Sequence, residues 1–286
     1  TAMVTPFNEN DQIDWSQLET FVSHQIEAGV DGLVPVGTTG ESPTLSAREK
    51  EELIRTVVQW VDGKIPVIAG AGSNSTRAAV ESTKRAADLG VTATMQVVPY
   101  YNRPTQDGMV DHFSAIADAV DVPMILYNVP ARTGACLNVE TVLRLADHER
   151  IVALKDAAGD ITAATKIVAD APERFSVLSG EDGLTYPLLS VGARGTISVL
   201  SNVFPELVVR MVRACNDRDW QAARDLHIAL IPLVELLFRE PNPAPLKAAM
   251  AARFGMSEKI RSPMREVCPE LRDELVKSVA EVTTRI

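Results

Sequence analysis

The feature that most constrains this chain is an alternation of short apolar runs with helix-like stretches. The apolar runs recur roughly every 25 to 35 residues, which is the spacing of repeated strand–helix units. Eight such units in about 200 residues are typical of a closed α/β barrel, the (β/α)8 or TIM barrel, rather than an open doubly wound sheet. The strands are expected at residues 2–5, 32–36, 66–70, 93–98, 123–127, 151–155, 175–179 and 195–199.

Beyond residue 199 the pattern changes to helices alone, and no flexible linker comes before them. We therefore expect a catalytic barrel over residues 1–203 and a C-terminal helical appendage, packed on the barrel, over residues 204–286. Ser46 and Glu49 form a capping box that predicts the start of one barrel helix. The other helices are expected at 14–28, 75–89, 106–119, 139–147, 161–169 and 184–191, and in the appendage at 204–215, 220–238, 245–253 and 270–282.

Composition and charge narrow the possible partners. A net charge of −10 argues against nucleic acid or an anionic membrane. No apolar run reaches the length of a membrane span and no signal peptide is visible, so we expect a cytoplasmic protein. The three cysteines and four histidines lack metal-ligand spacing, and the glycine-rich run 70–75 lacks the acidic partner that dinucleotide binding requires. We therefore expect no metal and no cofactor.

Lysine 155 is the first candidate for chemistry, because in such a barrel the active site lies where the strands end at their carboxyl side. The apolar run that starts at Ile151 leads directly into Lys155. Alternation along a strand predicts that Ile151, Ala153 and Lys155 share one face. Partial desolvation lowers the pKa of a lysine, and a neutral amine can attack a carbonyl to form a Schiff base. The alternative interpretation is an ordinary strand-end lysine that reaches into solvent.

Polar residues follow other expected strands. Two threonines and exposed N–H groups in Gly37–Ser42 can hold a carboxylate. Tyr127 ends the strand next to that of Lys155 and can relay protons, and Arg132 can bind a carboxylate through its planar guanidinium. Paired tyrosines in Tyr100–Pro104 indicate an interface or the edge of a site. Taken singly, each also fits a plain turn, a packed tyrosine or a solvated arginine.

Five motifs occur in order at these strand ends: Gly37–Glu41, Tyr100–Pro104, Tyr127–Gly134, Lys155–Asp156 and Gly195–Ser198. In this combination the chain closely resembles the dihydrodipicolinate synthases, a family in the N-acetylneuraminate lyase superfamily of class I, lysine-dependent aldolases. The resemblance covers essentially the whole chain, including residues 241–247. It implies a cofactor-free lyase of lysine and diaminopimelate biosynthesis that condenses pyruvate with L-aspartate 4-semialdehyde to 4-hydroxy-tetrahydrodipicolinate.

The same resemblance implies a role for each catalytic residue. Lys155 would form the Schiff base with pyruvate, and Tyr127 would donate and accept protons. Tyr127 would relay them through Thr38 to Tyr101, which crosses into the site of a neighbouring subunit in this family. A crossing tyrosine requires at least a dimer, and the family implies a homotetramer that is a dimer of dimers.

The substrate-binding residues are also implied by the resemblance. Thr39 and the backbone at Ile197 would hold pyruvate, with Gly180 close by, and Arg132 would bind the carboxylate of aspartate semialdehyde. Sialic acid lyases on this scaffold typically lack that arginine, which favours the synthase. A 2-keto-3-deoxy sugar-acid aldolase or a related pyruvate-dependent aldolase remains an alternative. A non-catalytic sensor of pyruvate-like acids is a further alternative, although a sensor needs no proton relay.

Many members of the family are inhibited by lysine in a cleft between paired subunits. This chain has an alanine where lysine-sensitive members carry a glutamate, and an alanine and a lysine where they commonly carry two histidines. A missing carboxylate and an added cation both disfavour a dibasic effector, so we expect weak or absent inhibition by lysine. The corresponding cleft residues are Ser42, Asn74 and Tyr100, which are kept, and Ala78, Ala47 and Lys50, which differ.

Overall fold

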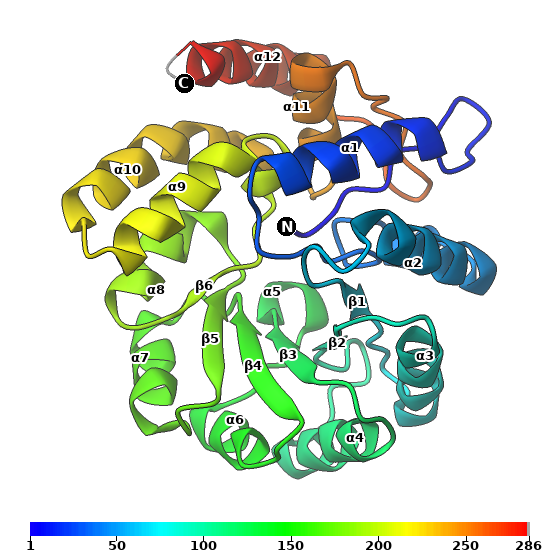
Figure 1. The fold of residues 1–286 in the computed structure, drawn as a ribbon, viewed down its shortest axis with the longest axis vertical. Coiled ribbons are helices and arrows are strands. Elements are labelled where there is room, and N and C mark those ends of the chain that lie inside the picture. Colours follow the sequence, from blue (N-terminus) through cyan, green and yellow to red (C-terminus); the bar gives the residue numbers. More distant parts are fainter. Residues whose placement is uncertain (285–286) are drawn as a thin grey trace.

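The protein, described for residues 1–284 by a computed structural model, is built around a curled sheet of six parallel strands (Figure 1). The strands lie side by side in chain order, as consecutive strand–helix units predict. Together with the helical C-terminal region, this arrangement confirms the predicted barrel class. The strands are β1 (Ile68–Gly70), β2 (Ala93–Val97), β3 (Met124–Asn128), β4 (Ile151–Asp156), β5 (Ser176–Ser179) and β6 (Gly195–Thr196).

The first two expected strands are too short to count as strands, although they close the ring. A single parallel bridge, Ala2 with Val34, joins the two segments, and another, Leu33 with Val67, joins the second segment to residues just before β1. The N–H of Ala2 also donates to the carbonyl of Ser198, 2.9 Å away, beyond the end of β6. Pro6 and Pro35 follow these bridges in the sequence, and a proline cannot donate to a sheet. The ladder therefore stays short where the barrel closes.

Helices follow most strands and surround the sheet, at the places where the sequence predicts them (Figure 1). The capping box at the start of α2 is confirmed: Glu49 N–H donates to Ser46 Oγ, and Ser46 N–H donates to Glu49 Oε2. The short α5 was not predicted. The helices of this part are α1 (Trp15–Glu27), α2 (Ala47–Val61), α3 (Thr76–Asp88), α4 (Gln106–Asp118), α5 (Pro130–Thr133), α6 (Val139–Ala146), α7 (Ile161–Asp170) and α8 (Thr185–Ser190).

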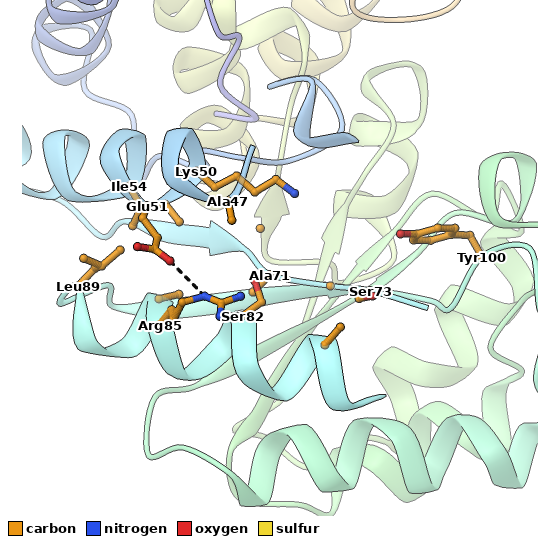
Figure 2. Close-up of a pocket in the computed structure, with 14 residues that line it drawn as sticks. Ala47, Lys50, Glu51, Ile54, Ala71, Ser73, Ser82, Arg85, Leu89 and Tyr100 are labelled. Atoms are coloured by element: carbon orange, nitrogen blue, oxygen red, sulfur yellow. Dashed lines mark ion pairs between the residues drawn. The ribbon is translucent and has the colours of Figure 1, made fainter. Parts of the chain in front are cut away.

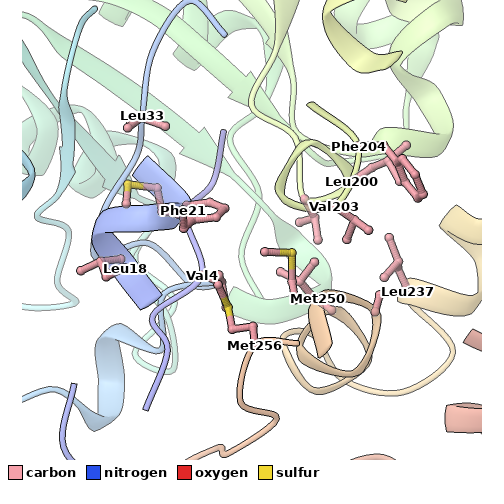
Figure 3. Packing of buried hydrophobic residues seen from close by; sticks show 14 of the residues in the cluster. Val4, Leu18, Phe21, Leu33, Leu200, Val203, Phe204, Leu237, Met250 and Met256 are labelled. Atoms are coloured by element: carbon pink, nitrogen blue, oxygen red, sulfur yellow. The ribbon is translucent and has the colours of Figure 1, made fainter. Parts of the chain in front are cut away.

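The C-terminal helices share a hydrophobic core with the start of the chain. Leu18 and Phe21 of α1 belong to the same buried cluster as Phe204 and Met250 (Figure 3). This shared core attaches the C-terminal region to the barrel. The boundary between the two at residue 203 stays a prediction. The helices are α9 (Pro205–Asn216), α10 (Trp220–Leu237), α11 (Ala244–Phe254) and α12 (Pro269–Thr283). Within residues 1–284 none of the helices is both long and apolar enough to span a membrane.

Candidate active site

Lys155 and Tyr127 lie side by side on β4 and β3, where the register pairs them directly. The lysine Nζ is 4.3 Å from the centroid of the tyrosine ring. Both residues are buried, with 5% and 6% of their surface exposed. The pairing of β3 with β4 is therefore enough to bring the Lys155 amine next to the Tyr127 ring, as expected from the sequence.

The expectation that Ile151 shares the inner face with Lys155 was wrong. A register shift between Met124 and Ile125 places Ile151 and Ala153 opposite consecutive residues of β3. An extra residue of this kind reverses the alternation of side chains before it. Ile151 consequently packs in the cluster that includes α4 and α6, whereas Ala153 packs with Tyr127 in the cluster around the sheet interior.

The ammonium of Lys155 makes no hydrogen bond or ion pair with any of the described residues 1–284, so it is not tied to a structural partner. Gly180 packs against the stem of this lysine: a Cβ on Gly180 would lie 3.0 Å from Lys155 Cγ. The N–H of Gly180 donates to the carbonyl of Asp156 at 2.7 Å. Gly180, predicted from the sequence as a substrate-binding residue, therefore lies beside the nucleophile and leaves room for its side chain.

A buried carboxylate lies on the neighbouring loop. Asp182 accepts hydrogen bonds from the N–H groups of Val199 and Leu200, both at 2.9 Å. Burial raises the pKa of Asp182 above its usual range, while those hydrogen bonds and the charge of Lys155 act in the opposite direction. The carboxylate thus fixes the segment after β6, which contains Ile197, and adds negative potential near the lysine.

A cavity of about 330 Å³ opens beside Tyr127 and is large enough for a small ligand, although Lys155 itself is not among its lining residues. Three of the predicted catalytic and substrate-binding residues, Thr38, Tyr127 and Arg132, line it. Met95 and Val97 contribute apolar wall. The structure thus brings together, from three different segments, a hydroxyl, a phenol and a guanidinium.

Thr39 and Ile197 are each held in place by a hydrogen bond. The Oγ1 of Thr39 accepts a hydrogen bond from Asn242 Nδ2 at 3.0 Å. The N–H of Ile197 already donates to the carbonyl of Ser179 at 2.8 Å, so the backbone group that Ile197 offers to a ligand is its carbonyl oxygen. Arg132 Nη2 donates to the carbonyl of Asn242 at 3.4 Å, which holds the guanidinium over the mouth.

Tyr101 is not part of the cavity of its own chain. Its side chain is 90% exposed, and its backbone is in the left-handed region with φ of +71°. For a bulky residue that conformation is a rare outlier. The relay of Tyr127, Thr38 and Tyr101 is therefore not assembled within one chain.

A second cavity, of about 230 Å³, lies between α2 and α3 (Figure 2). Four of the six predicted effector-cleft residues line it: Ala47, Lys50, Ala78 and Tyr100. Ser42 instead lines the larger cavity. Asn74 does not line the cleft, but its side chain donates to the carbonyl of Tyr100 at 3.2 Å.

The charged side chains that line this second cavity are mainly basic. Arg85 forms an ion pair with Glu51 at 3.2 Å, whereas Lys50 extends from α2 without one among the described residues (Figure 2). Burial, together with the nearby Arg85, lowers the pKa of Lys50. Lys50 and Tyr100 line both cavities, so the two share a wall.

Residues that the sequence analysis did not single out also shape the site. Asn242 contacts both Thr39 and Arg132, as described above. Lys247 of α11 forms a buried ion pair with Glu41, two residues after Thr39. The sequence signal was the run Pro241–Lys247, which the resemblance covered without assigning it a role. Among residues 1–284 no group of three or more His, Cys, Asp or Glu side chains is placed to hold a metal ion.

A parallel α/β barrel with a buried lysine beside a tyrosine at the carboxyl ends of its strands defines an enzyme class, the class I, lysine-dependent lyases. More specifically, the chain belongs to the dihydrodipicolinate synthetase family, whose family model matches residues 1–282.

Individual relatives match over nearly the full length. The chain is 46% identical over 282 residues to the 4-hydroxy-tetrahydrodipicolinate synthase of Koribacter versatilis, covering 98% of this chain and 94% of that protein. The solved structure of the synthase of Methylacidiphilum fumariolicum is 43% identical with a TM-score of 0.97, covering 99% and 95% of the two chains. A pyruvate complex of the chloride-inhibited dihydrodipicolinate synthase of Acinetobacter baumannii is 39% identical with a TM-score of 0.96, covering 99% and 97%.

Proposed function

We propose that this chain condenses pyruvate, held as a Schiff base on Lys155, with L-aspartate 4-semialdehyde to form 4-hydroxy-tetrahydrodipicolinate. The observation that carries the proposal is the Lys155 amine, buried 4.3 Å from the centre of the Tyr127 ring and without a partner among residues 1–284. The synthase names of the relatives and the pyruvate bound to one of them support the same substrates.

The first half of the reaction activates pyruvate. The Lys155 amine attacks the ketone carbon, and the carbonyl oxygen leaves as water after it takes up two protons, one from the attacking amine and one from Tyr127. Loss of a proton from the methyl group of the resulting iminium then gives an enamine, with Tyr127 as the base. The iminium acts as the electron sink, so the chain needs no other group to stabilise the carbanion.

The second half joins the two substrates. The enamine carbon attacks the aldehyde carbon of aspartate semialdehyde, and the alkoxide takes a proton from Tyr127. The amine of the bound semialdehyde then adds to the iminium carbon, gives one proton to the departing Lys155 nitrogen and returns the other to Tyr127. The ring closes as an imine, and the free lysine and the phenol are restored. Arg132, held over the cavity by the carbonyl of Asn242, is suited to bind the semialdehyde carboxylate through its guanidinium.

We infer that the active unit is at least a dimer and expect the homotetramer of the family. The support is Tyr101, which is 90% exposed in a strained backbone conformation. Strain of this kind costs about 1–3 kcal/mol and persists where it serves a function. Donation of the phenol to a neighbouring site would give that strain a purpose and would complete the relay from Tyr127 through Thr38.

A mixing experiment tests the crossing tyrosine. Lys155→Arg and Tyr101→Phe subunits are each expected to be nearly inactive alone. If Tyr101 serves the neighbouring site, each mixed dimer contains one intact site, and a 1:1 re-associated mixture regains about a quarter of wild-type activity. A mixture that stays inactive, although mass analysis detects mixed dimers, would show that Tyr101 acts only within its own chain.

The Schiff base is tested by borohydride reduction in the presence of pyruvate, followed by peptide mapping. We expect a pyruvate-derived adduct on Lys155 and fast turnover with aspartate semialdehyde. Lys247, the other buried lysine, is a built-in control because its ammonium is paired with Glu41 and should not react. An adduct without turnover would favour a sugar-acid aldolase, and no adduct would exclude the Schiff-base mechanism.

A further inference from the structure

We propose that Asn242 is a positioning residue for the pyruvate end of the site. Its side-chain amide fixes the hydroxyl of Thr39 so that the hydroxyl proton is left for the substrate carboxylate. The inference rests on the proposed function, because it assigns a role within the same site. Asn242 comes from the loop between α10 and α11, far from the barrel strands in the sequence.

The hydrogen bond between the two side chains decides which way the threonine proton points. Asn242 Nδ2 donates to Thr39 Oγ1 at 3.0 Å, and 5% and 3% of the two residues are exposed. A threonine hydroxyl has one hydrogen to donate and two lone pairs that accept. Because the amide occupies a lone pair, the hydroxyl keeps its own proton free. A carboxylate can only accept, so a hydroxyl held in this way matches it.

The remaining atom of the amide supports a role in binding. Asn242 Oδ1 is buried and has no hydrogen-bond partner among residues 1–284. Buried polar atoms are almost always paired, and those that are not need an explanation. The unpaired oxygen is therefore open to a ligand or a bound water, which fits a role of Asn242 in binding.

The backbone around Asn242 is held by contacts that do not involve its side chain. Lys247 of α11 is ion-paired with Glu41, which fixes the start of α11 against the loop that contains Thr39. The carbonyl of Asn242 accepts from Arg132 at 3.4 Å. The side chain of Asn242 thus serves the pyruvate end, and its backbone serves the proposed anchor of the second substrate. Substitution of the Asn242 side chain should therefore affect pyruvate binding and leave the binding of the second substrate unchanged.

The first test measures the KM of each substrate for Asn242→Ala and Asn242→Asp. For Asn242→Ala we expect the KM for pyruvate to rise about tenfold, because one buried hydrogen bond is lost. The KM for aspartate semialdehyde should stay within about twofold. Asn242→Asp should raise the KM for pyruvate further. A carboxylate accepts the hydroxyl proton and repels the substrate anion. Equal changes in both KM values would contradict the proposal.

A double-mutant cycle then asks whether Asn242 acts through the hydroxyl. Thr39→Val keeps the shape of the side chain and removes the hydroxyl. In that background Asn242→Ala should not raise the KM for pyruvate any further, whereas in a Thr39→Ser background it should do so as in the wild type. A full, additive effect in the Thr39→Val background would overturn the inference.

Controls separate this inference from stability and from the proposed function. Asn202 is also a buried asparagine, but its side chain bonds to the backbone of Ala2, Val4 and Val199. Asn202→Ala should lower Tm and leave the KM for pyruvate within about twofold. If Asn242→Ala does not fold, the isosteric Asn242→Asp carries the test. Failure of wild-type protein to form a borohydride adduct would defeat the proposed function, whereas a wild-type adduct with an unchanged KM in the Asn242 variants would defeat this inference alone.

Discussion

Lys247 of α11 and Glu41 of the loop before α2 form an ion pair that is almost completely buried, with 1% and 2% of their side chains exposed. Lys247 Nζ also donates to the carbonyl of Lys259 at 2.6 Å and lies 4.3 Å from the centre of the Phe7 ring. The other carboxylate oxygen of Glu41 accepts from the N–H of Arg261 at 3.0 Å. This one pair therefore joins the C-terminal region to the loop that carries Thr38 and Thr39.

Glu41→Gln is expected to destabilise the fold by about 3–5 kcal/mol, because it leaves a buried ammonium without its counter-charge. The double variant Glu41→Gln/Lys247→Met should recover most of that loss, since both charges are then gone. Urea unfolding measures the free energy of unfolding of the single and the double variant. Arg144→Gln, which breaks the exposed pair with Asp107, is the matched control and should change stability by less than about 1 kcal/mol. Equal losses for the buried and the exposed pair would contradict this account.

Arg132→Lys is expected to raise the KM for aspartate semialdehyde by at least about tenfold, because an ammonium cannot replace a planar, two-pronged donor. Trapping of pyruvate by borohydride should proceed at the wild-type rate, since Arg132 is not needed for the Schiff base. Steady-state kinetics with each substrate varied in turn gives the first value. Arg150→Lys, which alters a solvent-exposed ion pair with Asp121, controls for the substitution itself. A slower trapping rate would show that Arg132 also positions pyruvate.

L-lysine is expected to inhibit weakly, with half-maximal inhibition above about 1 mM, because the second cavity carries Lys50 and has Ala78 in place of a carboxylate. Replacing both, in Ala78→Glu/Lys50→His, should lower the lysine concentration for half-maximal inhibition by at least about tenfold. Initial rates against lysine concentration measure this. Potent inhibition of the unmodified enzyme would mean that the basic cleft does not exclude a dibasic ligand.

His112 should make the protein less stable as pH falls from 6.5 to about 4. Burial lowers the pKa of His112 from 6.5 to about 4, its Nδ1 lies 2.9 Å from Thr76 Oγ1, and its Nε2 is buried without a partner among residues 1–284. Between these pH values the unfolded chain binds the proton and the folded chain does not, so stability is complete above pH 6.5 and declines below it. The loss is at most about 3 kcal/mol and stops near pH 4.

Urea unfolding at several pH values measures this dependence. His112→Asn places a neutral amide near Thr76 and should remove the part of the decline that lies between pH 6.5 and 4. The carboxylates remain in both proteins and titrate alike, so the difference between the two curves isolates the histidine. Parallel curves for the variant and the wild type would rule out His112 as the source.

The sequence by itself determined the barrel and the nucleophile. Strand–helix alternation is a local pattern, and consecutive parallel strands lie side by side, so Tyr127 and Lys155 could be placed together from their positions at the ends of neighbouring strands. The capping box of α2 follows the same logic, because it involves residues only three apart.

Only the tertiary structure decided the features that depend on contacts between distant segments or on an irregular backbone. The register shift that turns Ile151 outward changes no residue type, so strict alternation cannot foresee it. The outward position of Tyr101 follows from a left-handed backbone that tyrosine does not favour. Asn242 and Thr39 are 203 residues apart, and a hydrogen bond over that separation leaves no periodic trace in the sequence. It exists only because burial of α11 against the barrel brings the two side chains together.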